Sequence, residues 1–91
     1  MTAPVGRRPL AVALRYAQPN APKVVAVGHG HVGQKIIDVA REHGVPLEQN
    51  PELAQALSKV GLDEEIPEQL YQAVAVVLAF ILRQAASRAP G

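Results

Sequence analysis

The segment Gly28-His29-Gly30-His31-Val32-Gly33 comes closest to a chemical site by residue type and spacing. It matches the pattern G-x-G-x-x-G, in which glycines let the backbone approach a pyrophosphate at the start of a helix. Glu48 lies 20 residues beyond Gly28, where a ribose-binding carboxylate is expected. A dinucleotide site also needs a doubly wound sheet, and this sequence accommodates a single crossover. The spacing therefore favours a tight strand-to-helix turn, with nucleotide binding as the alternative.

The histidines of this segment form an H-x-H pair, which could share a metal ion if both side chains left one strand. His29 and His31 instead lie at a glycine-rich turn, and the chain has no cysteine to complete a zinc site. His43 is expected to pack near the end of the following helix or to cap it. The serines, Ser58 and Ser87, fit no Ser-His-Asp arrangement. The sequence thus predicts no enzyme activity, no cofactor and no metal.

Two predicted strands precede the glycine segment 28–33 and would position it. Large and small residues alternate from Leu10 to Tyr16, which is the period of a strand. The β-branched run from Lys23 to Val27 is typical of a strand buried on both faces. A turn is expected between them, because residues 17–22 contain two prolines and an asparagine.

Helix signals follow. Gly44 is a natural C-cap, and Asn50 with Pro51 supplies an N-cap and a first helical residue. The sequence predicts an α/β (α+β) fold, a small mixed sheet of three to four strands surrounded by three helices, in the order β-β-α-β-α-α. The predicted strands are 10–16, 23–27 and 46–48, and the predicted helices are 30–43, 51–59 and 67–84.

The composition fits one small domain with an aliphatic core. The 91 residues are 48% apolar but only 3% aromatic, and the net charge is +1, which argues against nucleic-acid binding as the default. We expect a domain at 10–84 between a flexible arm at 1–9 and a disordered tail at 85–91. No signal peptide is recognisable, so a cytoplasmic location is expected.

The last predicted helix is unusually apolar. Its run Ala73–Leu82 carries no charge, yet it is too short for a membrane span, which needs about 20 residues. A helix on the surface of so small a domain normally exposes a polar face. Some of the residues Ala75, Val76, Ala79 and Phe80 should therefore be exposed, or covered by the N-terminal arm or by a partner. The expected core stripe is Leu70, Val74, Val77, Leu78 and Ile81.

Five segments, in order, resemble one family: AVALRY, APKVVA, AREHGVP, NPELAQAL and EIPEQLYQAVAVVLA. They are similar to the cytoplasmic C-terminal domain of the FlhB/YscU/SpaS family of flagellar and type III export components. Full-length members resemble this chain only at their end, after membrane helices. They cleave themselves at an Asn-Pro-Thr-His motif, whose four positions here hold Gly6, Arg7, Arg8 and Pro9. The expectation is a free-standing FlhB-like protein without the membrane part and without self-cleavage.

The resemblance implies a non-enzymatic interaction module, related to the substrate-specificity switch of the export apparatus. It implies a partner-binding patch of Ala21, Pro22, Ala75 and Leu78, which Val76 would enlarge. The implied partners are export-gate membrane proteins or export substrates, and the implied location is the cytoplasm, at the export apparatus on the inner membrane. The alternative within this family is an accessory, chaperone-like remnant without an export role.

The resemblance also implies an open sheet edge. In the family, the segment upstream of the cleavage motif supplies a strand beside the one that matches AVALRY. Without that strand the edge of the sheet is unpaired. It could pair with a second copy, giving a homodimer, or with a strand from a partner.

Overall fold

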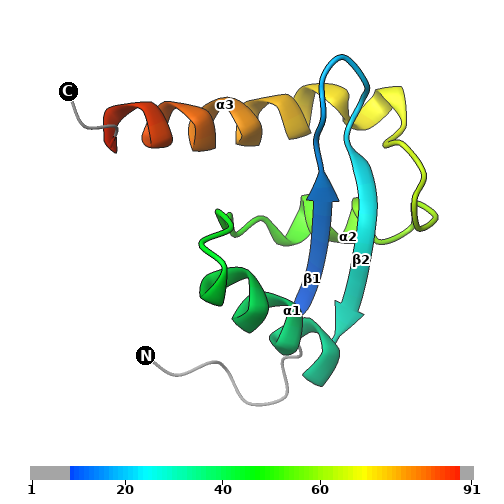
Figure 1. Cartoon of the computed structure of the whole chain (residues 1–91). Helices are drawn as coiled ribbons and strands as arrows, with labels where there is room; N and C mark the ends of the chain where they lie inside the picture. The colour runs from blue at the N-terminus through cyan, green and yellow to red at the C-terminus, as the bar shows by residue number, and fades with distance from the viewer. Residues whose placement is uncertain (1–8, 89–91) are drawn as a thin grey trace.

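The computed structural model describes residues 9–88, with side chains through residue 83. The strands β1 (Leu10–Arg15) and β2 (Lys23–His29) form an antiparallel pair. They are followed by the helices α1 (His31–Glu42), α2 (Pro51–Leu57), the 3₁₀ helix η1 (Glu68–Leu70) and α3 (Tyr71–Arg88). Figure 1 shows α3 crossing one end of the two-stranded ribbon, with α1 near the other end.

The large side chains of the ribbon lie on one face. Val12 pairs with Val27, and Leu14 pairs with Val24 beyond a bulge, so these side chains point to the same side. There they join a core of fully buried apolar residues from four segments of the chain: Val24, Leu57, Ile66 and Val74. Through Leu57 and Val74, this core attaches α2 and α3 to the ribbon.

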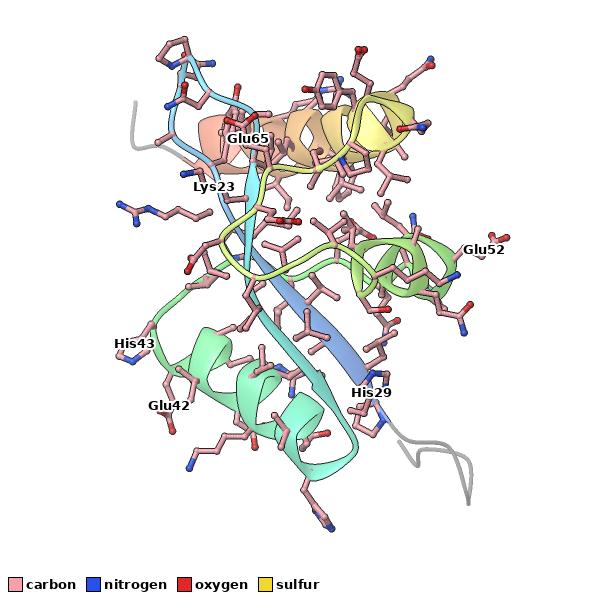
Figure 2. The ribbon with its side chains drawn as sticks, turned by 90° about the vertical axis from the view of Figure 1, so that its right-hand side faces the viewer. Lys23, His29, Glu42, His43, Glu52 and Glu65 are labelled. Atoms are coloured by element: carbon pink, nitrogen blue, oxygen red, sulfur yellow. The ribbon has the colours of Figure 1, made fainter. Side chains whose placement is uncertain are left out.

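The opposite face is built from small residues. Ala11 pairs with Gly28 and Ala13 pairs with Ala26, which lets α1 pack closely. A Cβ atom on Gly28 would lie 2.6 Å from Cγ1 of Val32 in α1. Figure 2 shows α1 and α2 on opposite sides of the ribbon.

The predicted capping residues Gly44 and Asn50 are confirmed. Gly44 has a φ of 69° after α1, and the Val45 N–H donates to the Ala40 carbonyl at 2.8 Å. The side-chain oxygen of Asn50 accepts from the Leu53 N–H at 3.1 Å and so caps α2. Of the two expectations for His43, capping is confirmed: His43 is the C-cap residue of α1, and its N–H donates to the Val39 carbonyl at 3.1 Å. Its side chain is exposed, so the alternative that it packs against the domain is wrong.

The predicted strand at 46–48 is wrong. Residues 45–50 are exposed and have no regular secondary structure, so the sheet in residues 9–88 has two antiparallel strands and is not a mixed sheet of three or four. A strand requires a neighbouring chain to complete its hydrogen bonds, and no other part of the described chain lies paired beside this segment. The observed order is β-β-α-α-α, with η1 before the last helix.

A segment that the sequence did not mark as a strand pairs with the outer edge of β2. The Val24 N–H donates to the Glu64 carbonyl at 3.1 Å, and the Asp63 N–H donates to the Val24 carbonyl at 2.7 Å. Lys23 and Glu65 form an isolated antiparallel bridge, and Figure 2 shows the two residues on adjoining segments. The start of β2 is therefore covered on its outer side.

The last helix confirms the predicted division into core and surface in part. Ala75, Val76, Ala79 and Phe80 are all exposed. Of the predicted core stripe, Val74 is buried and Leu70 and Leu78 pack against the core, whereas Val77 and Ile81 are half-buried and do not belong to that core cluster. The helix runs to Arg88, so residues 85–88 of the predicted tail have a helical backbone. Within residues 9–88, no helix has both the length and the apolar character that a bilayer crossing requires. Gly6, Arg7 and Arg8 of the predicted arm lie outside the described residues.

Candidate partner-binding groove

An open groove of about 330 Å³ lies between the β1–β2 loop and α3; we call it the loop–helix groove. The four residues that the resemblance implies for partner binding all line it: Ala21, Pro22, Ala75 and Leu78. Two come from the loop and two from a helix that begins some fifty residues later in the sequence. The fold therefore brings the predicted patch together, and its binding of a partner stays a prediction.

The loop side of the groove is held by backbone hydrogen bonds. The Asn20 N–H donates to the Ala17 carbonyl at 3.1 Å, which closes a tight turn. The Pro22 carbonyl accepts from the Ile66 N–H at 3.0 Å, which ties the end of the loop to the segment before α3. Pro22 is itself buried. The loop is thus fixed to the body of the domain by the same contacts that extend the edge of β2.

The helix side presents the first turns of α3. Val74 and Ile66, which are 2% and 3% exposed, are buried residues of the lining. Ala75 is exposed and Leu78 is half-buried against the core. A residue one position further along a helix points about 100° away. Consistent with this, Val76 is 65% exposed but does not line the groove, so it adds apolar surface elsewhere on α3.

Both tyrosines of the chain line the groove, and sequence reasoning did not include them. Tyr16 follows β1 and Tyr71 begins α3, and their side chains are 42% and 45% exposed. The Tyr16 hydroxyl accepts a hydrogen bond from Nε2 of Gln18 at 3.1 Å. The chain has only three aromatic residues, and the two tyrosines lie within a few residues of Ala21 and Ala75 in the sequence. This proximity is the signal by which they could have been included in the predicted patch.

The groove offers mainly apolar contact. None of its lining residues is charged; the polar groups among them are the side chain of Asn20 and the two tyrosine hydroxyls. The remaining lining residues missed from the sequence are Pro19, Ile66 and Val74. Such a surface suits an apolar side chain of a partner, with hydroxyl groups nearby to bond a backbone.

The glycine segment forms a tight strand-to-helix turn, as the favoured interpretation predicted, since Gly30 alone separates β2 from α1. Gly28 and Gly33 are buried against each other at the start of α1. Gly30 has a φ of 60°, and its N–H donates to the Pro9 carbonyl at 2.9 Å, so it is not free for a phosphate. His29 and His31 are exposed, and no cluster of metal-binding side chains occurs among the described residues. Nothing in this geometry favours the nucleotide alternative.

A family model decides the relationship: residues 8–81 match the FlhB HrpN YscU SpaS family. The chain belongs to this family. It is 40% identical over 75 residues to the uncharacterized protein YlqH of Bacillus subtilis, covering 80% of this chain and 81% of that protein. It is 45% identical over 73 residues to the flagellar biosynthetic protein FlhB of Salmonella typhimurium, covering 77% of this chain. Only 19% of that FlhB is matched, so the chain spans about a fifth of its length.

Solved structures of this family have the same fold. The cytoplasmic domain of FlhB from Shewanella putrefaciens superposes with a TM-score of 0.77 at 41% identity, covering 86% of this chain and 67% of that domain. The PscU C-terminal domain superposes with a TM-score of 0.75 at 30% identity, covering 80% of this chain and 96% of that one. This chain is thus similar both to a small protein, YlqH, and to the cytoplasmic domain of the flagellar protein FlhB.

Proposed function

We propose that this family member is a non-enzymatic protein-interaction module of a flagellar or type III export apparatus, related to its substrate-specificity switch. One observation carries the proposal. Ala21, Pro22, Ala75 and Leu78, far apart in the sequence, line a single apolar groove on the surface. The match to flagellar FlhB proteins supports the flagellar assignment, and it supports a place in the cytoplasm at the export machinery.

The chemistry of the groove suits a protein partner. An uncharged, apolar lining gains free energy by burying an apolar side chain, and tyrosines are frequent among the residues that dominate protein interfaces. The expected partners are therefore export substrates or export-gate proteins that present an apolar side chain from an exposed segment. The partner is proposed to seat this side chain over Val74, beside Ala75 and Leu78.

The test is the substitution Ala75→Asp. Ala75 is exposed and lines the groove, so a carboxylate there disturbs the contact surface and leaves the core intact. Binding to purified flagellar hook-type export substrates should fall at least about tenfold, or ~1.4 kcal/mol. The melting temperature should stay within a few degrees, since exposed substitutions usually change stability by less than about 0.5 kcal/mol.

The matched control is Val76→Asp, which places the same charge one residue further along α3, outside the groove. It should leave substrate binding unchanged. Leu78→Asp is a poorer test, because Leu78 packs against the core and its loss could unfold the domain. A folded Ala75→Asp protein that binds substrates as well as the original would exclude this groove as the docking site.

A further inference from the structure

One face of α3 is apolar in its middle and points away from the rest of the domain. Because a helix turns by about 100° per residue, this face lies nearly opposite Val74 and Leu78, which face the core. Its members are all exposed, and we call them the outer face of α3: Gln72, Val76, Ala79, Phe80 and Arg83. Val76 is 65% exposed and Phe80 is 46% exposed.

The outer face is turned away from the other helices that the structure describes. Figure 1 shows α3 continuing past the ribbon, and in both figures α1 and α2 lie on the same side of α3. The run Ala73–Leu82 contains no charged side chain, and a helix that is apolar on all sides is normally buried on all sides. An exposed phenylalanine beside an exposed valine on such a helix is typical of a contact surface.

The charges at the two ends of α3 indicate what covers this face. No acidic residue follows Glu68, and no basic residue lies between Lys59 and Arg83. The chain is therefore acidic just before α3 and basic at the end of α3. A second α3 lying antiparallel would place each acidic start beside a basic end, whereas a parallel one would place like charges together. The outer face is thus complementary to itself, as a twofold interface requires.

We propose that two copies of this chain associate through the outer faces of α3, with the two helices antiparallel. A twofold axis midway between Val76 and Phe80 sets Val76 of each copy opposite Phe80 of the other. The small side chain of Ala79 between them lets the helices approach to about 8–10 Å.

The same register brings the charged ends together. Arg83 lies opposite position 73 of the second copy, five residues or about 7.5 Å along the helix axis from Glu68 of that copy. The two long side chains can cross this gap. One pair of helices buries no more than the low end of specific interfaces, about 1,200 Å², so the association is weak and depends on protein concentration.

Sedimentation equilibrium of the full chain tests the proposal. Between about 10 µM and 1 mM, the average mass should rise from 9.7 kDa toward twice that value. Val76→Asp and Phe80→Asp should each keep the monomer mass over this range, because each buries an unpaired carboxylate at both ends of the contact. Both positions are exposed, so circular dichroism at the lowest concentration should show the original fold.

Ala75→Asp is the matched control, and it separates this proposal from the proposed function. It places the same charge on the preceding residue of α3, in the loop–helix groove, which shares no residue with the outer face. Val76→Asp should lose self-association and keep substrate binding, whereas Ala75→Asp should keep self-association and lose substrate binding. A groove that binds no substrate would therefore leave the mass measurement unchanged.

Single cysteines test the orientation, since the chain has none of its own. Val76→Cys and Phe80→Cys proteins, oxidised together, should form a mixed disulfide dimer, because these positions face each other across the twofold axis. Either variant alone should cross-link at least about fivefold less. Identical positions are four residues or ~6 Å apart along the axes, and a disulfide needs Cα atoms within about 7 Å.

Three outcomes would overturn the proposal. One is a monomer mass for the original chain at the highest concentration. Another is a dimer that persists in both Val76→Asp and Phe80→Asp, which would assign the contact to a different surface, such as the sheet edge. The third is cross-linking of Val76→Cys alone as efficient as that of the mixture, which would exclude the antiparallel arrangement.

Discussion

Single glycines decide how this chain passes from one element to the next, and they do so for two different reasons. Gly28 and Gly33 are needed for space, since a Cβ atom on either would collide with neighbouring atoms. Gly44 is needed for its backbone, with a φ of 69° and no atom within 4 Å of the position where a Cβ would stand. The end of α1 therefore depends on a left-handed residue at position 44, and packing there plays no part.

Gly44→Ala should destabilise the protein by about 1 kcal/mol, because alanine in the left-handed region is strained by roughly that amount. Urea denaturation would measure this as a lower midpoint with an unchanged slope. Gly44→Asn is the matched control and should cost less, since asparagine tolerates this conformation better. Equal stability of Gly44→Ala and the original protein would show that the αL end of α1 contributes nothing.

At the scale of elements, short helices are stabilised here by their ends and by one or two buried residues. α2 has seven residues, which is too short for independent stability in water. It is held by the Asn50 cap, by Pro51 at its first turn and by Leu57, which is 4% exposed in the core. α3 is longer and contributes Val74 to the same core, with Leu78 half-buried against it.

Asn50→Ala should reduce the free energy of unfolding by about 1 kcal/mol, because the Leu53 N–H loses its acceptor. In a domain of this size that is a fall of about 4–8 °C in melting temperature. Asn50→Asp retains an oxygen acceptor at the same place and should melt close to the original. If the melting temperature of Asn50→Asp falls as far as that of Asn50→Ala, the hydrogen bond to the Leu53 N–H does not account for the stabilising effect of Asn50.

At the scale of the whole molecule, a small core supports the surface proposed for partner binding. The loop–helix groove lies where α3 crosses the end of the ribbon. The fully buried apolar residues among those described are few, Val24, Leu57, Ile66 and Val74. A domain with so small a core has a low free energy of unfolding, so tests of the groove require variants at exposed positions.

The whole chain should remain intact in solution. The self-cleavage of the family that it resembles requires an asparagine, and the corresponding positions hold Gly6, Arg7, Arg8 and Pro9. Mass spectrometry after prolonged incubation of the purified protein should find the full mass, apart from removal of Met1. Formation of a fragment that begins at Arg7, Arg8 or Pro9, without added protease, would contradict this expectation.

Local features of this fold were predictable because local interactions decide them. The alternation in residues 10–16 and the β-branched run from Lys23 marked both strands, and Gly44 and Asn50 marked the helix ends that the structure shows. Helical spacing also separated buried Val74 from exposed Ala75. Each of these signals depends on backbone preference or on residues within one or two turns, which the order of amino acids specifies directly.

Pairing between distant segments was decided by the tertiary structure alone. Residues 46–48 have a strand-like sequence and form no strand, whereas residues 63–66 carry no strand signal and bond to the edge of β2. The groove likewise exists only because that bonding brings the loop at 17–22 beside the start of α3. The backbone hydrogen bonds of a strand are completed by the segment that lies next to it. Long-range packing determines which segment that is, and a local sequence pattern does not specify it.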